Sequence, residues 1–298
     1  MGAQVSAMML WALMMRVRLR LCRQMFIEGK MNGFDVIIQP DAEDADAAEV
    51  FVDGAIGGRP YRFLLDTGAA RSCVRYDDYT ATFASVGTDT SSGVFAGGSR
   101  DLVTAPSLAL GSIVRSDFTL VRAAQEDTRR QNLIGMDLLK DLRCHFRFDE
   151  RRVVTDEDGV EEDTAAFEEM FLDQRAHPWV PVQLGGVTAN AVWDTGASIT
   201  IVDAGFVARQ PGLFQAAGQS TGTDSTGAQQ ETPMYVMAAS VIGGQTFHAQ
   251  RVAAVDLAQV NATLERPMDL IVGYNAYSKA HWLFDFPRRR WRITRMLT

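Results

Sequence analysis

The chain has 298 residues, of which 47% are hydrophobic and 22% are charged. These values are close to globular averages, so they exclude a disordered protein, a collagen-like chain and a long coiled coil. The net charge of −8 argues against a nucleic-acid-binding enzyme. The three cysteines cannot form a disulfide framework and lack metal-ligand spacing, and no apolar run reaches the roughly 18 residues of a membrane-spanning helix.

Residues 1–33 form a leader that differs from the rest of the chain. An apolar stretch at residues 3–15 precedes four arginines within residues 16–23, whereas a secretory signal carries its positive charge first. The first six residues fit the N-myristoylation pattern, and the arginines could supply a second membrane signal. The alternatives are a disordered leader or a true start at Met25 or Met31. We therefore favour a cytoplasmic or peripherally membrane-associated location over a secreted one.

Residues 34–155 carry mostly strand patterns. Residues 50–65 predict two strands around a Gly57-Gly58 turn, and the second strand runs directly into Asp66. A stretch rich in Gly, Ser and Thr at residues 88–98 predicts a mobile hairpin. Residues 136–142 predict a short helix that starts just after an apolar-apolar-Gly element.

Residues 156–178 are predicted to be an acidic linker. Residues 156–173 contain nine acids and no base, and His177-Pro178 follows shortly after. A solvated acidic run before a proline is typical of a spacer, although an acidic binding arm is an alternative. Phe167 and Phe171 are four residues apart, which predicts one short amphipathic helix.

Residues 179–298 repeat the first region. The segment Phe63–Ala69 stands 128 residues before Ala191–Ala197, and each contains the motif Asp-Thr-Gly-Ala. Leu133-Ile134-Gly135 recurs 138 residues later, as Ile271-Val272-Gly273. A second Gly-rich, Ser- and Thr-rich stretch occupies residues 218–227. Because the offsets drift by only ten residues, we predict a duplicated lobe, at residues 34–155 and 179–298.

Two Asp-Thr-Gly-Ala motifs, each after an apolar strand and each paired with a later apolar-apolar-Gly element, resemble those of the retropepsin-type aspartic proteases. The resemblance covers about residues 34–155 and 179–298. It implies an all-β fold with two pseudo-twofold-related lobes in one chain and a few short helices. It also implies an endopeptidase that acts on polypeptides without metal or organic cofactor, as a monomer that works as an intramolecular pseudo-dimer. The net charge argues against nucleic acid as a partner.

The chemistry explains why each motif carries an aspartate. Two carboxyls held a few ångströms apart share one proton, so that one activates a water and the other hydrogen-bonds the scissile carbonyl. Asp66 and Asp194 are therefore the predicted catalytic residues. Supporting residues are Thr67, Gly68, Ala69, Thr195, Gly196 and Ala197. By resemblance, the two threonines hydrogen-bond across the lobe interface.

The two Gly-rich hairpins are predicted to be flaps that close over the substrate. The predicted flap residues that contact substrate are Phe95, Gly97, Gly98, Thr226 and Gly227.

The sequence also departs from the retroviral pattern, which pairs an aspartate after the first motif with an arginine after the later glycine. Ala70 and Ser198 stand at the first of these positions, and Met136 and Tyr274 at the second, so neither lobe can form that ion pair.

Other functions remain as alternatives. The main rival is a non-catalytic polypeptide-binding module on the same scaffold. A phosphoryl-transfer enzyme is disfavoured because both aspartates are followed directly by threonine. The matched pairs His145 and His281, and Asp149 and Asp285, are interpreted as structural residues and turn caps rather than as metal ligands.

Overall fold

The computed structural model describes residues 32–42, 44–92, 97–128, 130–156, 166–223 and 229–297. Residues 1–32 and residues 33–298 form two separate units, and the second is described here. The predicted leader, with its lipidation pattern and alternative starts, lies outside the described residues. Among the helices that the described ranges contain, none is long and apolar enough to span a membrane.

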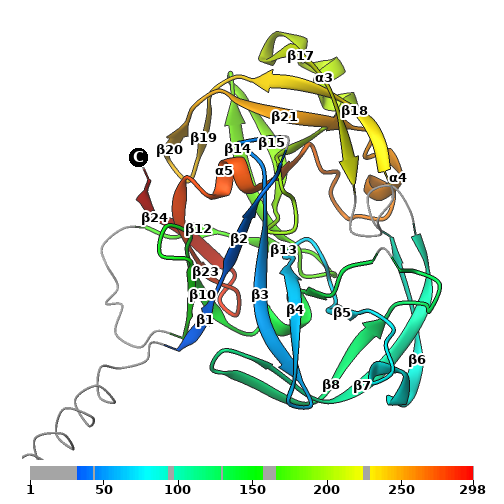
Figure 1. Ribbon diagram of the computed structural model, residues 1–298. Coiled ribbons are helices and arrows are strands. Elements are labelled where there is room, and N and C mark those ends of the chain that lie inside the picture. Colours follow the sequence, from blue (N-terminus) through cyan, green and yellow to red (C-terminus); the bar gives the residue numbers. More distant parts are fainter. Residues whose placement is uncertain are drawn as a thin grey trace, which may run out of the picture. The chain divides into compact units, whose positions relative to one another are not determined.

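Strands dominate the fold, as predicted, and an eight-stranded sheet forms what we call the first lobe (Figure 1). Its order is β2-β3-β4-β9-β5-β8-β7-β6. The strands are β2 (Ile37–Pro40), β3 (Ala48–Ile56), β4 (Arg59–Leu65), β5 (Cys73–Val74), β6 (Ser85–Ser92), β7 (Gly97–Leu110), β8 (Ile113–Arg122) and β9 (Leu133–Ile134). The short helices are η1 (Thr80–Thr82) and α2 (Met136–Leu139).

A ten-stranded sheet forms the second lobe, in the order β17-β18-β21-β16-β22-β15-β14-β19-β20, with β13 also paired to β14. Its strands are β13 (Phe171–Leu172), β14 (Pro178–Leu184), β15 (Val187–Trp193), β16 (Ile201–Asp203), β17 (Phe214–Thr223), β18 (Gln229–Met237), β19 (Ser240–Ile242), β20 (Gln245–Phe247), β21 (Gln250–Val255) and β22 (Leu270–Val272). Its helices are α3 (Ala204–Arg209), η2 (Pro211–Leu213), α4 (Ala258–Asn261) and α5 (Tyr274–Tyr277).

Both lobes use one strand-pairing scheme around the Asp-Thr-Gly motif. The strand before the motif (β4 or β15) runs parallel to a short strand (β9 or β22). That short strand is antiparallel to the strand after the motif (β5 or β16). The latter is in turn parallel to β8 or β21. The repeat seen in the sequence therefore corresponds to a repeated strand arrangement.

A third sheet combines strands from the N-terminal, middle and C-terminal parts of the chain, in the order β1-β11-β10-β23-β24-β12. Its members are β1 (Gly33–Asp35), β10 (Arg143–Arg147), β11 (Arg152–Thr155), β12 (Glu168–Glu169), β23 (Ala280–Asp285) and β24 (Arg290–Met296). The central pair is β10 and β23, which lie side by side and run antiparallel (Figure 1). Because this sheet takes strands from each repeat, it joins the two lobes.

The hydrophobic core is continuous from one lobe to the other. Trp193, at the end of β15, is fully buried, and its ring centroid lies 4.8 Å from that of Phe146 in β10 and 4.6 Å from that of Phe284 in β23. The shared sheet thus packs against the strand that leads into the second Asp-Thr-Gly motif.

The segment predicted to be a linker contains short strands instead of the predicted helix around Phe167 and Phe171. β12 pairs with β24, and β13 pairs with β14. The helix prediction was wrong because two existing sheets offer edges on which the backbone of this segment can hydrogen-bond. The acidic residues 157–165 lie outside the described ranges, and their role as a spacer stays a prediction.

Candidate active site

Asp66 and Asp194 stand at matched places, directly after β4 and β15. The backbone amide of Asp66 donates to the carbonyl of Ile134 at 2.9 Å, and that of Asp194 donates to Val272 at 3.1 Å. The acceptors are the last residues of β9 and β22. The parallel strand pair in each lobe therefore determines where its aspartate lies.

The two carboxyls lie beside each other at the junction of the lobes, and their side chains hydrogen-bond one another. The Gly68 amide donates across the junction to Asp194 Oδ1 at 3.0 Å, and the Gly196 amide donates to the same oxygen at 2.8 Å. A Cβ at Gly68 would lie 2.4 Å from Asp194 Oδ2, and a Cβ at Gly196 would lie 2.6 Å from Asp66 Cγ. Only glycine permits this approach.

Thr67 and Thr195, which follow the two aspartates, hydrogen-bond each other across the junction of the lobes. The amide of Thr67 donates to Thr195 Oγ1 at 3.1 Å, and the amide of Thr195 donates to Thr67 Oγ1 at 3.0 Å. Both threonines are completely buried. Thr67 Oγ1 also donates to the Trp193 carbonyl at 2.8 Å. The contact between lobes that the resemblance implied for these threonines is present.

Burial raises the pKa of each carboxyl above the usual value of an aspartate, and the two titrate as a coupled pair. For Asp66 the neighbouring charge of Asp194 raises the pKa further. For Asp194 the amides of Gly196 and Gly68 and the nearby His177 oppose the effect of burial. The two amides that donate to Asp194 Oδ1 favour the charged form of that carboxyl, and the pair as a whole keeps its shared proton to a higher pH than an isolated aspartate would.

In each lobe, one side chain of the short helix α2 or α5 accepts hydrogen bonds from a residue just after the Asp-Thr-Gly motif. We call this side chain the support of the motif, and its chemistry differs between the lobes. In the first lobe Asp137 accepts from the Ser72 amide at 2.8 Å and from the Ser72 hydroxyl at 2.7 Å. In the second lobe Asn275 Oδ1 accepts from the Thr200 amide and hydroxyl, both at 2.8 Å. Burial raises the pKa of Asp137. One support is therefore a carboxyl and the other an amide.

Gly135 and Gly273 allow two backbone segments to pass close to each other next to the site. A Cβ at Gly135 would lie 2.7 Å from the backbone carbon of Arg71, and one at Gly273 would lie 2.3 Å from that of Ile199. Real Cβ atoms do not approach other atoms so closely, so neither position accepts a side chain without movement of the backbone.

A cleft of about 560 Å³ opens over the two carboxyls and is lined by residues of both lobes. Asp89 from the β6–β7 hairpin lines it, as do Gly222 and Thr232 from the β17–β18 hairpin. These are the hairpins predicted to be flaps. Gly97 and Gly98 lie at the start of β7, opposite Ser92 and Ser91, whereas Phe95, Thr226 and Gly227 lie outside the described residues.

Two residues of the predicted linker, Asp173 and His177, belong to the surroundings of the cleft. His177 lines the cleft, and its Nδ1 contacts Asp173 Oδ2 at 2.7 Å. Trp179 Nε1 donates to the same oxygen at 3.2 Å. Neither residue is predicted from the sequence to lie near the site, because an isolated His in an acidic segment carries no motif.

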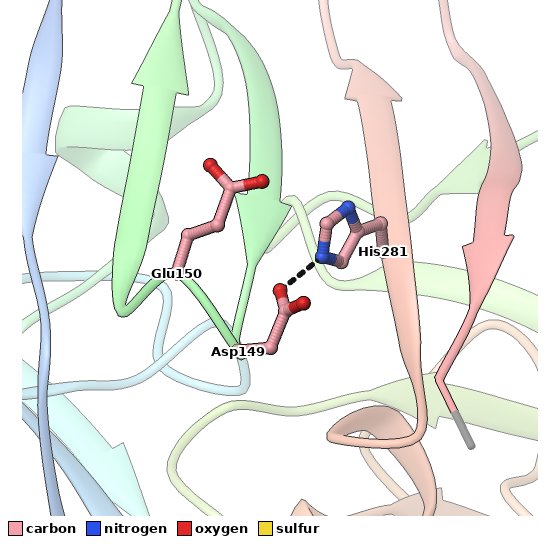
Figure 2. A group of neighbouring side chains, drawn as sticks. All are labelled: Asp149, Glu150 and His281. Carbon is pink, nitrogen blue, oxygen red and sulfur yellow. Dashed lines mark hydrogen bonds and ion pairs between the residues drawn. The ribbon is translucent and has the colours of Figure 1, made fainter.

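The cluster of Asp149, Glu150 and His281 contains a contact between the two repeats. Its potential ligand atoms lie within 4.8 Å of one another. Figure 2 shows the contact between Asp149 of the first repeat and His281 of the second. Arg295 also pairs with Asp149, and Arg147 pairs with Glu150. Because guanidinium groups already neutralise both carboxylates, we interpret the cluster as a structural contact between the repeats.

Asp285, which matches Asp149 in the repeat, accepts from the amide of Arg288 at 3.3 Å and from the side chain of Arg290 at 3.0 Å. The predicted role as a turn cap is therefore observed for Asp285. Cys73 and Cys144 are buried free thiols.

Comparison with known protein families identifies both motif regions. Residues 52–141 match the family described as "gag-polyprotein putative aspartyl protease", and residues 180–276 match the family described as "Aspartyl protease". No individual curated protein matches the chain. Each matched region contains one Asp-Thr-Gly motif and the strands that surround it. The chain therefore carries two retropepsin-like aspartyl protease domains, one in each repeat.

Proposed function

We propose that the chain is an aspartic endopeptidase whose catalytic pair consists of Asp66 and Asp194, one from each lobe. The observation that carries the proposal is the reciprocal approach of each motif glycine to the aspartate of the other lobe, at 2.4 to 2.6 Å for an added Cβ. The cleft over both carboxyls supports it, since a polypeptide needs access to the pair.

In the proposed mechanism, ionised Asp194 takes a proton from a water that attacks the carbonyl carbon of the peptide bond. Asp66 gives its proton to the carbonyl oxygen, which forms a neutral tetrahedral diol. Asp194 then protonates the amide nitrogen, Asp66 recovers a proton from one hydroxyl, and the C–N bond breaks. The products are a carboxylic acid and an amine, and both aspartates return to their starting states.

The two amides that donate to Asp194 Oδ1 support this division of roles, because they stabilise a carboxylate there. The substrate is an extended polypeptide held between the lobes, with the flap hairpins pairing to its backbone. The predicted flap contacts at Phe95, Gly97, Gly98, Thr226 and Gly227 belong to this proposal.

The test is cleavage of a peptide library by the wild type, Asp66→Asn and Asp194→Asn. Each substitution is expected to reduce kcat/KM by at least about 10³-fold, since it removes one member of a pair that acts as a unit. Asp53→Asn is the matched control, because Asp53 is exposed and forms its ion pair with exposed Arg62. If Asp66→Asn cleaves as well as the wild type, the chain is not an aspartic protease. If the wild type binds peptides without cleaving them, the non-catalytic polypeptide-binding module is favoured instead.

The same proposal places both halves of the active site in one chain, so catalysis requires no association step. Specific activity is expected to stay constant on dilution from micromolar to nanomolar protein. A loss of specific activity that follows the dissociation of a dimer would contradict the intramolecular pairing of Asp66 and Asp194.

A further inference from the structure

Arg130 is a buried cation on the first-lobe wall of the cleft. It is 6% exposed and lines the cleft together with Cys73, Val121 and Leu133. Its Nε donates to the sulfur of Cys73 at 3.2 Å. Its Nη1 is buried, and within the described part of the chain no atom accepts a hydrogen bond from it. A buried charged donor without an acceptor is costly to keep in a folded protein.

The acidic side chains on this wall already have partners. Asp89 pairs with Arg71 at 3.2 Å, Glu49 accepts from Gln131 at 3.2 Å, and Asp137 accepts from Ser72. Asp127, close to Arg130, pairs with Arg100 at 3.8 Å. The wall therefore offers a donor, and the carboxylates around it are engaged elsewhere.

The second lobe has no such cation at the matching place. The 138-residue offset that relates Leu133 to Ile271 relates Arg130 to Met268. Met268 also lines the cleft and belongs to an apolar cluster with Val192, Val255 and Ile271. Cys73 corresponds to Ile201, which packs against that cluster. The two walls thus use matching positions of the repeat but differ in chemistry.

We propose that Arg130 selects an acidic side chain of the substrate, Glu or Asp, on the first-lobe side of the scissile bond, while the Met268 side accepts an apolar one. This inference rests on the proposed endopeptidase function. A substrate carboxylate that reaches Arg130 from the cleft would accept from its guanidinium and neutralise the charge, and charged hydrogen bonds of this kind are about twice as strong as neutral ones. A substrate without the carboxylate leaves the buried donor unpaired, which is a strong basis for discrimination.

Cleavage-site profiling of the wild type first identifies the substrate position that faces the first-lobe wall. The test then compares peptides that differ only by Glu, Gln or Leu at that position. We expect the wild type to prefer Glu. Arg130→Met, which copies the second lobe, is expected to reduce the ratio of kcat/KM for Glu over Leu peptides about 10- to 100-fold. Arg115→Met is the matched control, because it removes the same charge from an exposed first-lobe arginine that hydrogen-bonds a neighbouring carbonyl.

Thermal unfolding distinguishes recognition from a structural role. If Arg130 serves the substrate, Arg130→Met keeps or raises the Tm, because it removes a buried unpaired charge. A Tm well below that of the wild type would show that Arg130 serves the fold and would overturn the inference. Cleavage by the wild type with no preference for Glu, or an unchanged preference in Arg130→Met, would overturn it as well. The proposed function fails separately, if the wild type cleaves no peptide at all.

Discussion

The two lobes have the same strand pairing but differ in the side chains placed on it. Around the junction they match closely: both present Asp-Thr-Gly, and the threonines exchange hydrogen bonds of 3.0 and 3.1 Å. Away from it the symmetry ends, since Asp137 faces Ser72 in one lobe and Asn275 faces Thr200 in the other. A homodimer must use one sequence for both halves, whereas a duplicated chain lets each half change independently.

The comparison of the two lobes separates contacts that the site requires from contacts that can differ between the copies. The hydrogen bonds between the two threonines and the close approach of each motif glycine to the opposite carboxyl occur in both copies, because each copy contributes half of them. Other buried side chains vary between the copies, as Leu65 and Trp193 illustrate: they occupy the same place before the two aspartates, and both are fully buried. Substitutions at four kinds of position can sharpen or break this comparison.

The largest effect is expected at the glycines that approach the opposite carboxyl. Gly68→Ala and Gly196→Ala each push a methyl group against an aspartate, and each is expected to reduce kcat/KM by at least about 10²-fold, as misplaced catalytic groups do. Peptide cleavage assays measure the effect. Gly212→Ala is the control, because nothing lies within 4 Å of its added Cβ. Strongly unequal effects at Gly68 and Gly196 would break the symmetry claimed for the junction.

Trp193→Leu gives the second lobe the residue of the first and is expected to destabilise the protein by about 2–4 kcal/mol. The cost arises because the indole packs against rings of the shared sheet, and a smaller side chain leaves a cavity among them. Urea unfolding measures the change. Val86→Ala, at an exposed position, should alter the free energy of unfolding by less than about 0.5 kcal/mol. A cost for Trp193→Leu no larger than this would mean that the two lobes are interchangeable here.

Exchanging the two supports tests the next difference. Asn275→Asp is expected to cost about 1–3 kcal/mol at pH 7, because Asn275 Nδ2 donates to the Arg251 carbonyl at 2.7 Å and a carboxylate cannot. Asp137→Asn is expected to lower the stability less, because the Asp137 carboxyl accepts hydrogen bonds from Ser72 and an amide oxygen can also accept. Urea unfolding of both variants measures the two costs, and equal costs would contradict the difference claimed for the supports.

Asp137→Asn is also expected to differ from the wild type in its response to pH. Burial raises the pKa of Asp137, so its contribution to stability is fully present below its unfolded pKa and is lost as pH rises through the folded value. The Tm of Asp137→Asn relative to the Tm of the wild type should therefore be higher at pH 7 than at pH 4, as measured by thermal unfolding. The opposite trend would contradict the raised pKa.

The last comparison concerns the matched histidines. His145 hydrogen-bonds Thr294 at 2.9 Å, whereas His281 contacts Asp149. Burial, with Arg147 and other nearby cations, lowers the pKa of His145 to about 3. Stability from this neutral imidazole is lost as pH falls from about 6.5, where the unfolded histidine gains its proton. His145→Gln should flatten the fall of Tm between pH 7 and pH 4. His248→Gln, at an exposed position, should not.

Much of the fold and of the candidate site could be predicted because the signals are local or repeated. The strand before each aspartate, the turn at Gly57-Gly58 and the start of α2 at Met136 follow from short-range patterns. The gap-free 128-residue offset around the two motifs is enough to match Asp66 with Asp194. Repetition converts two weak tripeptides into one strong signal, because a chance match would not keep its place in a duplicated lobe.

Only the tertiary structure decided what surrounds the two carboxyls. Arg130 and His177 carry no motif, and each reaches the cleft because strands distant in sequence bring it there. The same holds for Phe167 and Phe171, where sheet edges from β24 and β14 replaced the predicted helix with strands. Periodicity reports what a segment prefers alone, whereas backbone hydrogen bonds to a neighbouring strand and burial beside a distant side chain depend on how the whole chain folds.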